Sequence, residues 1–312
     1  MDPERVAAVR IRPCTTIPGR LSEGPRWHDE RGELLWVDIL GCTIHRGRSL
    51  DDGHVELLGT VTLDRHVGAV APWIHGGYVV AGGEGFVFVD VSGRTKELAQ
   101  PAAGSGAVRM NDGACDPQGR FWAGTMAYDE APGGGALYRL ELDGSCVTVL
   151  EGLTISNGIG WSPDGSTMYL SDSGTRRVDV FDFDGPSGAI SGRRPFVVVD
   201  APRVAPDGLT VDEDGGVWIA LWGGGEVRRY APDGSLTATV RLPVDRPTSC
   251  AFGGPDRSVL FVTTARDGLD DAALEGQPHA GKLLRIDGLQ VRGVPCLPYR
   301  GRIDDAGPSG TA

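Results

Sequence analysis

The chain has 312 residues, of which 40% are hydrophobic and 23% charged, a composition typical of a globular protein with an ample core. Its formal net charge of -12 disfavours nucleic acid and anionic membranes as partners, and we expect neither. No stretch approaches the roughly 20 consecutive apolar residues that a membrane-spanning helix needs.

The first residues carry acidic side chains and no apolar segment follows them, so we expect no signal peptide. The six cysteines are far apart and include no Cys-x-x-Cys pair. A disulfide scaffold or a thiolate zinc site is therefore not expected, and a reducing cytoplasm is the compartment that fits these features.

A repeated unit runs through the chain: a short apolar stretch, a polar turn with glycine, and a strand rich in Trp, Tyr, Val and Leu. Six copies are present, at residues 25–38, 70–81, 114–124, 160–171, 210–220 and 251–263. Their spacing averages about 45 residues, the size of one four-stranded propeller blade. No segment shows a long apolar period of 3.6 residues, so we expect the chain to be almost all β.

These repeats predict an all-β fold, a six-bladed β-propeller with a central metal-binding channel. We expect one domain over residues 1–312, with about 15–300 structured and 303–312 forming a flexible tail. A β-sandwich or a solenoid is the alternative, but a sandwich does not need six equivalent units of similar length.

One position in the repeat is polar in five of the six units. Four residues before Trp27, Cys115, Trp161, Val211 and Phe252 stand Glu23, Asn111, Asn157, Asp207 and Thr248. The innermost strand of each blade runs along the channel, so equivalent positions should point at one axis. Glycine follows three of these residues directly, as in Asn157-Gly158 and Asp207-Gly208. Such pairs are also common turn dipeptides, which is the alternative explanation for each one alone.

Carboxylate and amide oxygens that converge without sulfur or imidazole are suited to hard cations such as Ca²⁺, Mg²⁺ or Mn²⁺. A site with only three protein ligands would leave positions for water and substrate. The six histidines share no repeat position, and His66 is the one most suitably placed to reach the site.

The motifs at these positions resemble the senescence-marker-protein/gluconolactonase family, also called regucalcin-like, over about residues 21–295. The resemblance rests on short sequences in order, among them Ser22-Glu23-Gly24-Pro25, Arg109-Met110-Asn111-Asp112-Gly113, Ser156-Asn157-Gly158 and Pro206-Asp207-Gly208. It implies a six-bladed propeller that binds one divalent ion and opens aldonolactones. Calcium is the favoured ion, with Zn²⁺, Mn²⁺, Mg²⁺ or Fe²⁺ as alternatives.

The resemblance also implies roles for single residues. Glu23, Asn157 and Asp207 are the expected metal ligands, and Asp207 the expected general base. Arg109 and Asn111 are expected to contact substrate oxygens. Asp129 aligns with the family's substrate-facing acid, although its neighbour Glu130 could take that place because Asp is shorter by one methylene.

The expected partner is a small sugar lactone, and the expected state is a monomer. Two alternatives remain open at this stage. One is another metal-assisted hydrolase on the same fold, acting on organophosphates or other lactones; the other is a non-catalytic calcium-binding propeller. The sequence does not identify the sugar.

Overall fold

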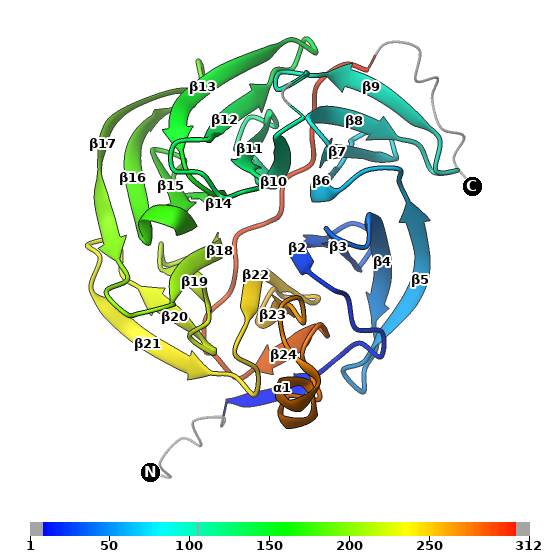
Figure 1. The fold of residues 1–312 in the computed structure, drawn as a ribbon, viewed down its shortest axis with the longest axis vertical. Coiled ribbons are helices and arrows are strands. Elements are labelled where there is room, and N and C mark those ends of the chain that lie inside the picture. The colour runs from blue at the N-terminus through cyan, green and yellow to red at the C-terminus, as the bar shows by residue number, and fades with distance from the viewer. Residues whose placement is uncertain (1–8, 105, 304–312) are drawn as a thin grey trace.

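The computed structural model describes residues 9–104 and 106–303, and these residues form a ring of six four-stranded antiparallel sheets (Figure 1). The six-bladed propeller expected from the repeats is confirmed. Residues 304–312, most of the expected C-terminal tail, lie outside the described residues. In the described part of the chain, no helix has the length and apolar character to span a membrane.

The blades follow one another in chain order, each running from the channel outward. The first contains β2 (Ser22–His28), β3 (Glu33–Asp38), β4 (Thr43–Ser49) and β5 (Val55–Thr62). The second contains β6 (Val67–Pro72), β7 (Tyr78–Gly82), β8 (Gly85–Val89) and β9 (Thr95–Ala99). The third contains β10 (Val108–Cys115), β11 (Phe121–Ala127), β12 (Gly135–Leu140) and β13 (Cys146–Leu153).

The fourth blade contains β14 (Ser156–Trp161), β15 (Thr167–Asp172), β16 (Arg177–Asp184) and β17 (Ala189–Val198), with the short 3₁₀ helix η1 (Ser173–Thr175) after β15. The fifth contains β18 (Ala205–Val211), β19 (Val217–Trp222), β20 (Glu226–Tyr230) and β21 (Leu236–Arg241). The sixth contains β22 (Pro247–Gly253), β23 (Val259–Thr264) and β24 (Leu284–Asp287), and the helix α1 (Asp271–Gly276) lies between the last two.

The N-terminal strand closes the ring. β1 (Arg10–Pro13) pairs antiparallel with β24 and is the outermost strand of the sixth blade. The strand therefore begins before residue 15, where the structured part was expected to start. Because the first and last parts of the chain share one sheet, the ring closes with ladder hydrogen bonds as well as side-chain packing.

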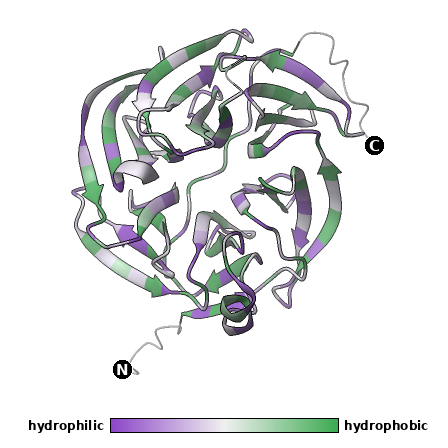
Figure 2. Ribbon diagram, in the orientation of Figure 1, coloured by the Kyte–Doolittle hydropathy of each residue, from purple (hydrophilic) through white to green (hydrophobic). Residues whose placement is uncertain are grey.

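The hydrophobic core is divided into six clusters, one at each interface between neighbouring blades. The cluster between the sixth and first blades, for example, contains Trp27, Trp36 and Phe261, and the Trp27 and Phe261 rings stack with centroids 6.1 Å apart. Outer strands such as β21 carry hydrophilic and hydrophobic bands in Figure 2, because one face of each packs and the other meets solvent. Apolar burial between blades thus holds the ring together.

The C-terminal segment after β24 crosses one face of the ring. The innermost strand of each blade begins at the opposite face and ends at this one. Its backbone bonds to turns of several blades: Glu213 N donates to Arg292 O at 2.8 Å, Tyr299 N to Pro72 O at 2.8 Å, and Arg300 N to Gly119 O at 3.0 Å. Tyr299 is fully buried. The segment covers a cavity of about 240 Å³ lined mainly by apolar side chains.

Every innermost strand is irregular at the same point. Register shifts occur between Glu23 and Arg26, Val67 and Ala69, Met110 and Gly113, Ser156 and Ile159, Pro206 and Leu209, and Pro247 and Ser249. A bulge re-aims the side chain that it carries, and bulges are frequent beside active sites. The polar positions found by counting along the repeat fall on these bulges.

Two glycines at the bulges are required by close approach between blades. A Cβ added to Gly158 would lie 2.6 Å from the carbonyl oxygen of Asp207, and one added to Gly208 would lie 2.0 Å from Ser249 Oγ. Both glycines lie inside strands, β14 and β18. The Asn-Gly and Asp-Gly pairs are therefore bulge residues that allow neighbouring strands to converge, and the turn explanation is wrong for them.

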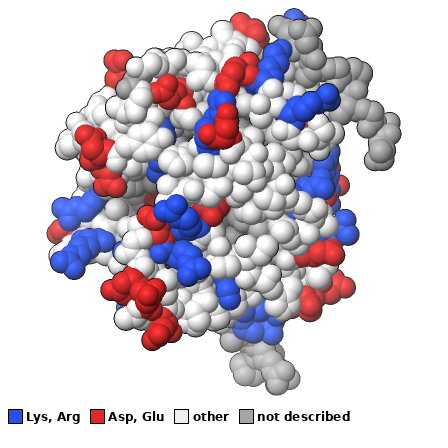
Figure 3. Space-filling model, turned by 45° about the vertical axis from the view of Figure 1, so that its right-hand side comes forward, with Lys and Arg blue, Asp and Glu red and all other residues white. Residues whose placement is uncertain are grey.

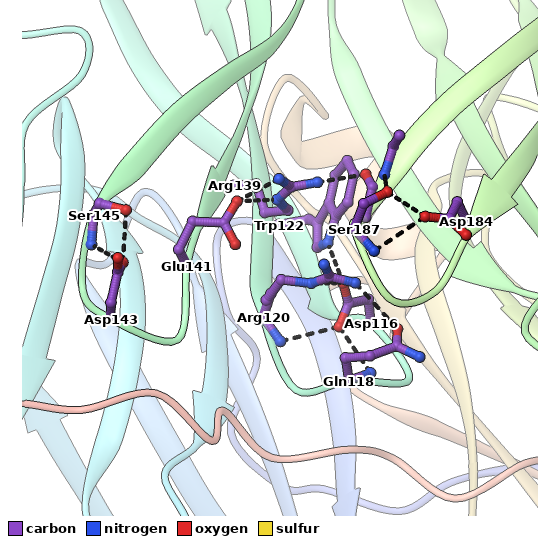
Figure 4. A network of polar contacts seen from close by, with 12 residues as sticks. Asp116, Gln118, Arg120, Trp122, Arg139, Glu141, Asp143, Ser145, Asp184 and Ser187 are labelled. Atoms are coloured by element: carbon purple, nitrogen blue, oxygen red, sulfur yellow. Dashed lines mark hydrogen bonds and ion pairs between the residues drawn. The ribbon is translucent and has the colours of Figure 1, made fainter.

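A buried aspartate stabilises the first turn of two blades in the same way. In the third blade, Asp116 accepts hydrogen bonds from the backbone N–H of Gln118, from Arg120 Nε at 2.6 Å and from Trp122 Nε1 at 2.9 Å (Figure 4). In the fifth blade, Asp212 accepts from Trp218 Nε1 at 2.8 Å and from Arg229 Nε at 2.7 Å. Each carboxylate links a turn, a core tryptophan and a cation.

We expect Asp212→Ala to lower the free energy of unfolding by about 3 kcal/mol, because it leaves buried donors and the Arg229 guanidinium without their acceptor. Chemical denaturation measures the loss. Asp214→Ala, at an exposed position in the same turn, is the matched control and should change the stability much less. Equal losses in both variants would contradict the role of Asp212.

Candidate functional site

The channel opens, at the end where the innermost strands begin, into a cavity of about 560 Å³. Its lining includes Glu23 of β2, Arg109 and Asn111 of β10, Asn157 of β14 and Asp207 of β18. All five side chains are buried. The structure therefore brings together the three expected metal ligands and two of the expected substrate contacts, from four different blades.

The remaining polar repeat position does not reach this cavity. Thr248 of β22 is fully buried, and its hydroxyl donates to the backbone oxygen of Ser22 at 2.6 Å. In the second blade the bulge carries Gly68, and a Cβ there would lie 2.2 Å from the backbone oxygen of Asn111. Two blades thus use this position to pack strands against each other, and four use it to present polar side chains.

The Asn157 side chain is oriented by a hydroxyl that the sequence analysis did not identify. Ser173 in η1 donates its single hydroxyl hydrogen to Pro206 O at 2.7 Å, so it must accept a hydrogen bond from Asn157 Nδ2, which lies 3.0 Å away. The amide oxygen of Asn157 is therefore free. It is buried without a hydrogen-bond partner among the described residues, as is Oδ1 of Asp207.

Negative charge is concentrated in the channel. Burial raises the pKa of Glu23 well above its ordinary value, and the nearby carboxylates of Asp207 and Asp112 raise it further. The pKa of Asp207 is raised by burial and by Asp112, while the Asn157 amide and Arg109 act in the opposite direction. Each shift means that the buried anion is destabilised in this environment.

Asp112 belongs to this group, although the sequence analysis assigned it no role. It is 3% exposed and lies 3.4 Å from Arg26 Nη2, which also donates to Gly113 O at 2.6 Å. Arg26 lines the apolar cavity on the other side. The Arg26–Asp112 pair therefore separates the two cavities of the channel, and it adds both a carboxylate and a guanidinium to the buried charges.

The donor set fits a divalent cation. The buried charged groups of the channel are the carboxylates of Glu23, Asp112 and Asp207 and the guanidinium groups of Arg26 and Arg109, so they carry one net negative charge when ionised. The free oxygens of Asn157 and Asp207 would supply ligands of the type that hard cations prefer. The described residues contain no group of three or more His, Cys, Asp or Glu side chains that could hold a metal ion.

Arg109 is held by its neighbours at the floor of the cavity. Its Nη1 donates to Asn111 Oδ1 at 2.7 Å and to Met110 O at 3.1 Å, and Asn111 Nδ2 donates to Ser156 O at 2.8 Å. The Asn111 amide thus orients Arg109. The contacts with substrate expected for Asn111 and Arg109 stay predictions. The remaining N–H groups of Arg109 are the donors that a substrate oxygen would meet.

The acidic pair after β11 is divided between two environments. Both residues are exposed, but Glu130 lines the cavity, whereas Asp129 accepts a hydrogen bond from Ala131 N at 3.1 Å within the turn. The role expected for Asp129 stays a prediction, and the placement favours its alternative, Glu130. His66 also lines the cavity, beside Tyr128, with ring centroids 5.7 Å apart.

Comparison with known proteins shows where this arrangement belongs. The model of the family described as "SMP-30/Gluconolactonase/LRE-like region" matches residues 21–266. The chain belongs to this family. It is 38% identical to regucalcin of Danio rerio over 299 residues, which cover 95% of this chain and 100% of that protein.

Solved structures of the family have the same fold. The calcium-binding protein regucalcin from Agrobacterium tumefaciens superimposes with a TM-score of 0.85 at 31% identity, covering 91% of this chain and 95% of that one. A luciferin-regenerating enzyme gives a TM-score of 0.85 at 30% identity, covering 95% of this chain and all of the other. The family thus includes proteins named for calcium binding and for catalysis.

We expect Ser173→Ala to weaken Ca²⁺ binding about 10- to 100-fold, because the Asn157 amide loses the acceptor that orients it. Isothermal titration calorimetry on chelator-treated protein measures the affinity. Thr175→Ala, two residues away in the same turn, is the control and should bind as the wild type does. Unchanged affinity in Ser173→Ala would contradict the orienting role.

We expect Glu23→Gln to have opposite effects with and without metal. In chelator it should stabilise the fold, because it removes one of three mutually repelling buried carboxylates. With Ca²⁺ added at about 100 times its dissociation constant, the wild type should gain about 2.7 kcal/mol and the variant much less. Thermal unfolding with and without Ca²⁺ measures both effects. A variant that is less stable in chelator would contradict the repulsion argument.

Proposed function

We propose that the chain hydrolyses a sugar lactone to the open-chain aldonic acid with one bound divalent cation, Ca²⁺ being the favoured ion. The observation that carries the proposal is the pair of buried, unpartnered oxygens of Asn157 and Asp207 beside the Glu23 carboxylate, facing a cavity whose floor also holds Arg109. The family name supports the reaction class, and the printed description of the bacterial relative supports calcium.

The cavity fits a small polar substrate. Its volume of about 560 Å³ lies within the usual range for sites that enclose a small molecule, roughly 300–1,000 Å³. Three protein ligands from Glu23, Asn157 and Asp207 would leave coordination positions for substrate. A platform that only binds other proteins does not need a buried arginine directed at the same point, and this favours catalysis over a purely structural ion.

The side chains have distinct parts in the proposed reaction. When bound, the cation would polarise the lactone carbonyl. Arg109 donates hydrogen bonds to substrate oxygens and remains protonated throughout. Asp207 accepts a proton from the attacking water, and the water oxygen bonds to the carbonyl carbon. The ring C–O bond then breaks and Asp207 returns its proton to the ring oxygen, which leaves as a hydroxyl group. The new carboxylic acid keeps the second water proton and releases it at neutral pH.

The direct test measures proton release from a panel of aldonolactones, corrected for spontaneous opening, with chelator-treated protein and each of Ca²⁺, Zn²⁺, Mn²⁺, Mg²⁺ and Fe²⁺. We expect metal-dependent acceleration on at least one sugar. Asp207→Asn should lower kcat by about 10²-fold or more, because it removes the base. Calorimetry on the same variant separates this effect from loss of the ion.

Two outcomes would count against the proposal. If an Asp207 variant kept full turnover with the ion bound, the assignment of the base would be wrong. If the ion bound but no lactone opened faster than in buffer, hydrolysis of sugar lactones would be wrong, and a calcium-binding propeller or another hydrolase would take its place.

A further inference from the structure

Two arginines at the rim of the site cavity have no assigned role. Arg176 follows η1 and Arg203 lies between β17 and β18; both are exposed, and both line the cavity whose floor holds Arg109. Arg203 makes no side-chain hydrogen bond or ion pair with any described residue. Arg176 makes only a long hydrogen bond, 3.5 Å from its Nη1 to Ala201 O. Two arginines with most of their guanidinium donors free therefore line the same cavity.

The backbone at these arginines is unusual. Six residues other than glycine in the described ranges have positive φ, and three of them line this one cavity: Glu130 at 55°, Arg176 at 54° and Arg203 at 62°. Glycine or asparagine adopts this conformation more readily than a long side chain does. Non-glycine residues in sparsely populated backbone regions cluster at ligand sites, where the side chain is needed.

The charges around the rim do not cancel these two cations. Of the four acidic residues lining the cavity, Glu23 and Asp207 belong to the buried floor. At the rim, Asp267 is paired with Arg20 at 3.2 Å and Glu130 remains. At the floor, a bound divalent ion would convert one net negative charge into one net positive charge. Figure 3 shows basic and acidic side chains in small mixed groups over the surface, and the whole chain is strongly acidic. With such an ion bound, the cavity would be a local positive region on a negative protein, which would favour anions there.

We propose that Arg176 and Arg203 bind an anionic group carried by the sugar at the end remote from the reacting carbonyl, so that the substrate is an acidic sugar lactone. The anion is a carboxylate or a phosphate, since planar guanidinium groups bind both through paired hydrogen bonds. This inference rests on the proposed function and adds the substrate class. A neutral sugar lactone would leave both guanidinium groups directed at solvent.

The test compares three lactones: neutral glucono-1,5-lactone, a monolactone of glucaric acid that keeps a free carboxylate, and 6-phosphoglucono-1,5-lactone. We expect one of the two acidic lactones to have a kcat/KM about tenfold or more above that of the neutral one. The double variant Arg176→Gln/Arg203→Gln should remove this preference through KM and leave the neutral lactone unchanged. Lysine at both positions should restore part of the preference for the acidic lactone, and added salt should reduce this preference in the wild type.

A matched control and a binding measurement make the result decisive. Arg31→Gln changes an exposed arginine in a turn at the opposite end of the blades and should have no effect. Calorimetry with the open-chain acids gluconate, glucarate and 6-phosphogluconate tests the rim without turnover. Tighter binding of a dianion that the double variant loses would support the inference even if no lactone were opened, in which case only the proposed hydrolysis would fail.

Three results would overturn the inference while leaving hydrolysis intact. The acidic lactones could open no faster than the neutral one, the double variant could leave every substrate unchanged, or it could slow the neutral and acidic lactones equally. Whichever acidic lactone is preferred identifies the anion as carboxylate or phosphate.

Discussion

The burial of three neighbouring carboxylates in one channel is the constraint on which the rest of this site depends. Closing the ring brings Glu23, Asp112 and Asp207 from three blades into one space with little water, where each raises the free energy of the others. The apolar clusters between blades supply the stabilisation that keeps these groups together. A cation bound there would relieve the repulsion, so ion binding and fold stability would be coupled.

The same convergence explains why the innermost strands are irregular. Six strands that meet at one axis leave little room, and at Gly158 and Gly208 the backbone of one blade contacts its neighbour directly. The bulges turn Asn157 and Asp207 toward the channel at these points. The same bulges therefore allow the strands to pack and direct Asn157 and Asp207 into the channel. A side chain larger than hydrogen at either glycine would disturb both.

The number of blades and most of the polar channel positions could be predicted from the sequence, because both follow the repeat. The repeat indicated six blades, and counting back four residues located Glu23, Asn157 and Asp207 at the same bulge position. The same count also selected Thr248, which joins strands, since local spacing does not say which polar side chain reaches the cavity. Ser173 and the Arg26–Asp112 pair were missed because their roles depend on partners distant in sequence, 86 residues apart in the latter case. The rim arginines lie in irregular segments that carry no repeat.

The position of β1 has a consequence for how the protein is made. During synthesis this strand leaves the ribosome before the other described strands, yet its partner β24 follows only after all of the other blades. An edge strand with unpaired backbone groups is thus carried through nearly the whole of translation, the condition in which strands pair with the wrong neighbour. Its four residues, Arg10–Pro13, include two arginines and end in proline, features that discourage such pairing until the last blade arrives.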